Sequence, residues 1–80
     1  MDDAEIFDRI HALVEEEHQL EDAHVGEGLN AEDQERLQKV EIALDQCWDL
    51  LRQRRARRNV GLDPDDAEVR DEGTVEGYRQ

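Results

Sequence analysis

The chain has 80 residues, of which 23 are acidic and 10 are basic, and its formal net charge is -13. This length allows one small domain. The negative charge argues against nucleic acid or an anionic membrane as the main partner, because both would repel the chain. No apolar run approaches the roughly 18 residues that cross a membrane. The acidic start is unlike a secretory signal, and the lone cysteine cannot form an internal disulfide, so we expect a cytoplasmic protein.

The first predicted helix runs from about residue 3 to residue 24. Its seam positions recur at alternating intervals of four and three, which places them on one helix face. They are Ile6, Ile10, Leu13, Glu17, Leu20 and His24. Glu17 is a polar residue within this stripe, and we expect it to fix the register of the helix pair.

A second helix is predicted from about residue 31 to residue 59. Two glycines in residues 25–29 predict the turn before it, Asn30 is a good N-cap, and Gly61 is a good stop. A second heptad stripe contains Leu37, Val40, Leu44, Cys47, Leu51, Arg54 and Arg58. The short turn makes the two helices antiparallel neighbours, so the predicted fold is an all-α, coiled-coil-like hairpin.

Asp63 and Pro64 predict the N-cap and first residue of a short third helix that ends near Val69. From Asp71 onwards the chain has the composition of a tail. We therefore divide the chain into a helical hairpin over residues 1–62 and a short helix with a tail over residues 63–80. This second part either packs on the hairpin or trails from it.

The hairpin has more apolar surface than one helix–helix seam uses. The surplus residues beside the stripes are Phe7, Val14, Ala43, Trp48 and Leu50. Chains this short usually need a disulfide, a metal or self-association. A two-fold dimer that forms a four-helix bundle is the simplest way to cover this flank. The alternatives are a C-terminal tail anchored by Val69, Val75 and Tyr78, or a different partner protein.

Arginines crowd the end of the second helix. Hairpin formation brings them near Asp2, Asp3 and Glu5, so we expect ion pairs within the chain that also complement the helix dipole. Docking of an acidic or phosphate-bearing partner is one alternative. Nucleic-acid binding is another, although the run lacks interleaved aromatic residues. The candidate interaction residues are Phe7, Val14, Trp48, Leu50, Arg54, Arg55, Arg57 and Arg58.

Two Glu-x-x-His pairs on the first helix are candidate metal ligands. They are Glu15 with His18 and Glu21 with His24. Residues three apart share a helix face, and di-iron carboxylate bundles use such pairs together with glutamates from facing helices, here Glu35 or Glu41. In a chain so rich in glutamate this spacing also arises by chance. We therefore predict no resident metal or other cofactor, and a metal-binding bundle remains an alternative.

No other pattern indicates catalysis. Residues 63–74 depart from the calcium-binding loop, which requires glycine where Glu68 stands, so helix capping explains Asp63 better. Cys47 is expected to be a small buried side chain. Phosphate-binding loops and nucleophile elbows are absent from the sequence. We therefore expect that the protein is not an enzyme.

Three segments resemble a family of short proteins of unknown function from actinomycete-type bacteria. They are LDQCWDLLRQRR from Leu44 to Arg55, RIHALVEEEH from Arg9 to His18, and the ending from Val75 to Tyr78. The resemblance implies a stand-alone bacterial, intracellular helical hairpin and supplies no catalytic or ligand residues. We expect a non-enzymatic protein-protein interaction module that forms a homodimer. A regulator that docks through its Arg-rich helix end is a further alternative.

Overall fold

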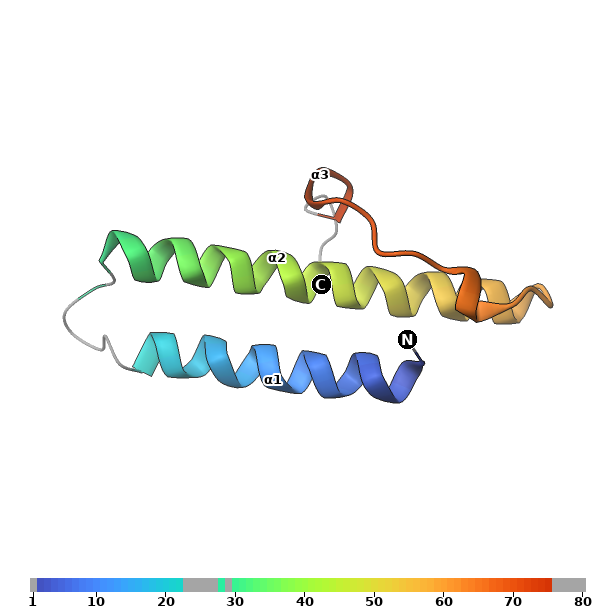
Figure 1. Ribbon diagram of the computed structural model, residues 1–80, viewed down its shortest axis with the longest axis horizontal. Coiled ribbons are helices and arrows are strands. Elements are labelled where there is room, and N and C mark those ends of the chain that lie inside the picture. The colour runs from blue at the N-terminus through green and yellow to red at the C-terminus, as the bar shows by residue number, and fades with distance from the viewer. Residues whose placement is uncertain (1, 23–27, 29, 76–80) are drawn as a thin grey trace.

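The computed structural model describes residues 2–22, 28 and 30–75. These residues form α1 (Asp3–Asp22), α2 (Ala31–Asn59), the 3-10 helix η1 (Pro64–Asp66) and α3 (Glu72–Val75). The two long helices lie antiparallel, and the chain after α2 turns back along α2, on the other side from α1 in this view (Figure 1). The prediction of an all-α hairpin with a short third helix is confirmed.

Local capping explains where the long helices begin. The backbone N–H of Glu5 donates to Asp2 Oδ1 at 2.8 Å, and the N–H of Asp2 donates back to Glu5 Oε1 at 3.4 Å. This reciprocal pair satisfies donors that the first helical turn leaves open. Asn30 Oδ1 accepts from the N–H of Asp33 at 2.8 Å in the same way. α1 matches its prediction as far as Asp22, and the predicted end at His24 lies outside the described residues.

α2 ends where glycine allows the chain to turn. Gly61 has a φ of 78°, in the left-handed region that favours glycine. The N–H of Leu62 donates to the carbonyl of Arg57 at 2.8 Å, and the N–H of Gly61 donates to that of Arg58 at 3.2 Å. These two bonds form a Schellman motif, which satisfies the last carbonyls of the helix. The predicted bounds of α2 are therefore confirmed at both ends.

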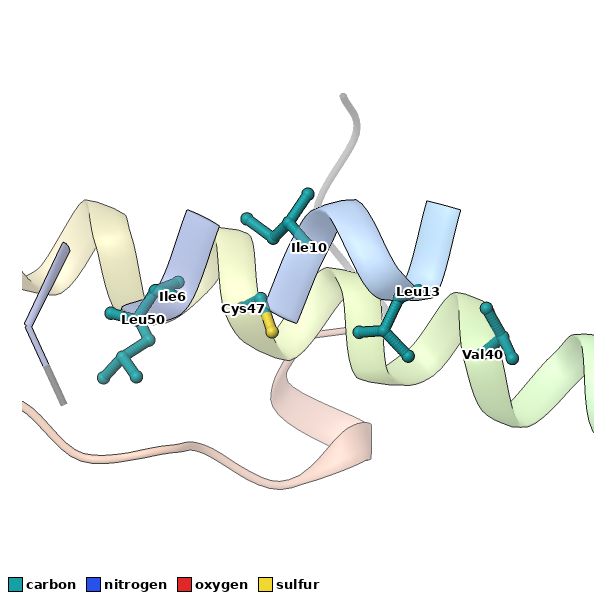
Figure 2. Packing of buried hydrophobic residues seen from close by; sticks show 6 residues of the cluster. All are labelled: Ile6, Ile10, Leu13, Val40, Cys47 and Leu50. Carbon is teal, nitrogen blue, oxygen red and sulfur yellow. The ribbon is translucent and has the colours of Figure 1, made fainter. Parts of the chain in front are cut away.

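An apolar seam joins α1 to α2. Figure 2 shows its six buried side chains, which are Ile6, Ile10, Leu13, Val40, Cys47 and Leu50. Five of them come from the two predicted stripes. Leu50 was expected on an exposed flank, but it is buried in the core cluster instead. Each large aliphatic side chain buried here contributes roughly 1.5–3 kcal/mol.

The predicted third helix over residues 64–69 is wrong in length, because only the 3-10 turn η1 forms there. Asp63 caps η1 as expected, with its Oδ1 accepting from the N–H of Asp65 at 2.9 Å. At Ala67 the backbone is already extended. Side chains of α2 bind the carbonyls of Asp63 and Glu68, so these carbonyls have partners without a helix.

The expected tail contains a short helix in its described part. Asp71 caps α3 by accepting from the N–H of Thr74 at 2.8 Å, and hydrogen bonds from Thr74, chiefly its side chain, lower the pKa of Asp71. Val75 is fully buried, as its expected role as an anchor requires, whereas Val69 is exposed. Tyr78 lies outside the described residues. Within the described ranges, no helix has the length and apolarity needed to span a bilayer.

Candidate functional site

Aromatic and arginine side chains from both long helices line an open groove of about 240 Å³ near the start of α1. The lining residues are Asp3, Phe7, Trp48, Leu51, Arg52, Arg55 and Arg58. The rings of Phe7 and Trp48 pack edge to face, with centroids 6.3 Å apart and planes at 79°. Phe7 nevertheless remains 45% exposed and Trp48 37% exposed. The structure thus brings these two predicted interaction residues together, each with much of its surface open.

The groove continues into an apolar stripe on the same side of the hairpin. Phe7 and Trp48 directly follow the seam residues Ile6 and Cys47, so they lie at one edge of the seam. Val14 lies two helical turns after Phe7 and is half-buried. We call this surface the front face and define it as Phe7, Val14, Leu44, Trp48 and Leu51, flanked on α2 by Glu41 and Arg55.

Arg54 is buried at the open end of the hairpin, with only 5% of its surface exposed. Its Nε donates to Asp3 Oδ1 at 2.5 Å, and its Nη1 donates to Asp65 Oδ1 at 2.9 Å and to the Pro64 carbonyl at 3.2 Å. The hydrogen bonds to Asp3, and then to Asp65, raise the pKa of Arg54. Arg54 therefore holds the fold together and is not available to a partner, contrary to its place among the candidate interaction residues.

Two further candidate arginines are also engaged within the chain. Arg58 Nη2 lies 2.9 Å from Asp3 Oδ2, and Arg57 Nε donates to the Asp63 carbonyl at 2.7 Å. Hydrogen bonds from Arg58, and then from Arg54, lower the pKa of Asp3. Arg55 is exposed and forms no ion pair within the part of the chain that the structure describes.

The expected pairing of arginines with the acidic start of α1 is thus only partly right. Asp3 makes the ion pairs with Arg54 and Arg58, while Asp2 and Glu5 cap the helix instead. Asp65 and Asp66 were not expected as partners, yet they pair with Arg54 and Arg57. The signal for them was the acidic run that begins at Asp63, five residues after the last of these arginines.

Residues 63–75, which we call the returning segment, run back along α2 and contact it through polar side chains. Asp49 is 2% exposed, and its Oδ2 accepts from Gln53 Nε2 and from Arg70 Nε, both at 2.9 Å. Gln53 also donates to the Glu68 carbonyl at 2.6 Å, and Gln46 donates to the Arg70 carbonyl at 3.2 Å. Asp49 Oδ1 has no hydrogen-bond partner among the described residues. Sequence reasoning missed Asp49, although Gln46 and Gln53 lie one helical turn to either side of it.

A second groove, of about 200 Å³, lies beside the returning segment. It is lined by Ile6, Arg9, Ala43, Gln46, Cys47, Leu50 and Val69. Ala43 and Leu50 therefore face this groove, and the expected continuous flank is divided between two sides of the hairpin. Burial raises the pKa of the Cys47 thiol, against the opposing charge of Arg9, so the thiol stays protonated at neutral pH.

A family model described as "Protein of unknown function (DUF2630)" matches residues 2–80. The chain belongs to this family. Two relatives are "Uncharacterized protein Mb0922c" from Mycobacterium bovis and "Uncharacterized protein Rv0898c" from Mycobacterium tuberculosis. Each is 49% identical over 77 residues, which cover 95% of this chain and 88% of the relative. No solved structure matches the chain. The expected resemblance to a bacterial family of unknown function is confirmed.

The candidate metal ligands of this DUF2630 chain that the structure describes do not form a metal-binding cluster. Glu15, His18 and Glu21 are exposed on α1, and His24 lies outside the described residues. Glu35, a possible ligand from α2, instead lies 3.4 Å from Lys39 one turn away. Over the described ranges, three or more His, Cys, Asp or Glu side chains nowhere surround one point that a metal could occupy.

Proposed function

We propose that the protein is a small, non-enzymatic protein-protein interaction module of the bacterial cytoplasm, and that it self-associates through its front face. The observation that supports this most directly is the Phe7–Trp48 pair, whose rings contact each other while more than a third of each residue's surface remains exposed. Aromatic residues and arginine are enriched at protein interfaces and dominate their binding energy. The groove contains both kinds of residue side by side.

The shape of the hairpin favours the same surface. Two packed helices have one seam between them, and each helix keeps further sides open. The returning segment covers one side of α2. It does so with the buried Val75 and with Arg70, which donates to Asp49 beside Gln53. The front face has no such cover among the described residues. A large aromatic side chain can bury about 150–250 Å², so pairing two front faces would remove substantial apolar surface from water.

The negative charge of a second copy of the chain also complements the arginines on this face. The chain carries a net charge of -13, yet the groove lining holds three arginines and one acid, Asp3, which pairs with Arg58. An acidic protein surface is the complement of such a groove, and the chain itself supplies one. The lone Cys47, buried and protonated, is compatible with a reducing compartment.

Native mass spectrometry and sedimentation equilibrium test this proposal on protein purified without chelators or a metal-binding tag. We expect a dimer at micromolar concentration, and we expect Trp48→Ala to weaken it about tenfold or more. The matched control is Val60→Ala, because Val60 is 70% exposed but lies outside the groove lining.

A chain that stays monomeric and cooperatively folded up to high micromolar concentration would refute self-association. Equal weakening by Trp48→Ala and Val60→Ala would refute the front face as the surface used. A stoichiometric metal in the spectrum would instead favour the alternative of a metal-binding bundle.

A further inference from the structure

Opposite charges flank Trp48 on the front face of α2. A row of residues recurs there at alternating intervals of four and three, and it borders the buried residues Val40, Cys47, Leu50 and Arg54 that face α1. The row consists of Leu37, Glu41, Leu44, Trp48, Leu51, Arg55 and Arg58. The row shares its leucines and Arg58 with the predicted heptad stripe, and Leu44 and Leu51 also pack against the core. Glu41 lies seven residues before Trp48, and Arg55 lies seven residues after it. Each is therefore about 10 Å from Trp48 along the helix axis, in opposite directions.

We propose that two copies of the chain pack front face to front face with their α2 helices antiparallel. Trp48 then lies beside the two-fold axis, and Glu41 of each copy pairs with Arg55 of the other. This inference rests on the proposed self-association, because it names the partner and the register of the same face. A two-fold axis makes every contact occur twice, so this single register forms two ion pairs.

Both members of the proposed pair are open to a partner. Glu41 and Arg55 are exposed, and neither forms an ion pair within residues 2–22, 28 and 30–75. The neighbouring arginines Arg54, Arg57 and Arg58 are all paired with carboxylates.

Charge also selects the orientation. A parallel arrangement would place Arg55 against Arg55 and Glu41 against Glu41, and like charges at such positions disfavour the pairing. The antiparallel arrangement replaces both repulsions by attractions. The row from Leu37 to Arg58 is about 30 Å long, which is long enough for an interface of the ordinary size of about 800 Å² per partner.

Charge reversal tests the register. Glu41→Arg and Arg55→Glu each bring like charges together twice, so each variant alone should dimerise about tenfold more weakly than the native chain. A mixture of the two variants should form a heterodimer about as tight as the native dimer, because each Glu–Arg pair is then restored across the interface. The variant that carries both reversals should likewise form a homodimer of near-native affinity.

Glu41→Arg is the more telling single variant, because it reduces the total negative charge and so relieves general repulsion between copies. The matched control is Glu68→Arg, which makes the same charge change in the returning segment. Glu68 is exposed, and its backbone carbonyl accepts the hydrogen bond from Gln53 of α2. We expect this control to dimerise at least as well as the native chain. Circular dichroism of every variant establishes that the hairpin is intact.

The measurements are sedimentation equilibrium and native mass spectrometry of each variant alone and of the mixture. Weaker dimers of each single variant, with native affinity restored in the mixture and in the double reversal, would support the antiparallel register. If the mixture dimerises no better than its components while the native chain is dimeric, the register is overturned and the proposed function stands. A monomeric native chain would overturn both proposals.

Discussion

The two sides of α2 are held by different kinds of interaction. Towards α1, the contact consists of buried aliphatic side chains and a thiol, with Ile6 fully buried among them. Towards the returning segment, α2 presents Gln46, Asp49 and Gln53, which bind backbone carbonyls and the Arg70 side chain. Val75 is the buried apolar residue of that segment.

This difference shows what each kind of contact can specify. Apolar burial is strong and non-directional, so the seam can join two helices with no special geometry beyond a heptad repeat. Hydrogen bonds contribute only about 0.5–1.5 kcal/mol each, but they fix the path of an irregular chain. The seam therefore supplies most of the stability. The hydrogen bonds of Gln46, Asp49 and Gln53 decide where the returning segment lies.

Removing a seam side chain should have the largest effect. Ile6→Ala leaves a cavity where a fully buried side chain was, and such changes cost about 2–5 kcal/mol. Because small domains are only marginally stable, we expect this variant to be largely unfolded. Urea denaturation followed by circular dichroism measures the loss. Val60→Ala, at a position 70% exposed, is the control and should change the stability by less than about 0.5 kcal/mol.

A smaller and more local effect is expected from Asp49→Ala. This change leaves Arg70 and Gln53 without their shared acceptor, and a lost buried partner costs about 1–3 kcal/mol. Hydrogen exchange should become faster at amides in residues 67–75 and stay slow at the seam. Equally faster exchange in α1 would contradict the separation of the two sides. Glu68→Ala is the control, because Glu68 is exposed and its backbone carbonyl, which the substitution keeps, accepts the bond from Gln53.

The smallest effect concerns Asp3 and pH. Its folded pKa lies below the ordinary value of 3.8, first because of Arg58 and then because of Arg54. The unfolded chain therefore binds this proton at a higher pH than the folded chain. The stabilisation by Asp3 is present above about pH 4 and is lost as the pH falls through the folded pKa.

Thermal unfolding midpoints between neutral pH and about pH 2 measure this loss. The Asp3→Asn variant should be less stable at neutral pH and should lose less on acidification. Asp8→Asn removes an exposed acid elsewhere in α1 and serves as the control. The same acid loss in Asp3→Asn as in the native chain would show that the Asp3 ion pairs do not stabilise the fold.

The hairpin could be predicted because its signals are local. Asn30 and Gly61 mark the ends of α2 through their own backbone preferences, and the heptad stripes identify the seam. The heptad phase also separates two neighbouring residues, since Arg54 falls on the seam stripe and is buried whereas Arg55 does not and is exposed. The contact between Phe7 and Trp48 follows from the same phase.

The returning segment could not be predicted in this way. Its path depends on carbonyls bound by side chains from a helix 15 to 24 residues earlier in the chain, and no periodicity records such contacts. The side on which Leu50 and Ala43 lie depends in turn on that path. The apolar surplus was therefore visible in the sequence, but its division between the two sides of the hairpin was not.

Arg54 belongs to both sides at once, because one guanidinium group holds Asp3 at the start of α1 and Asp65 in η1. The two acids are far apart in the sequence, yet they share a single counter-ion. Their energetic contributions are therefore coupled, and replacing both should cost an amount different from the sum of the single replacements. Through this one side chain, loosening of the returning segment is transmitted to the first turn of α1, which contributes Asp3 to the groove on the front face.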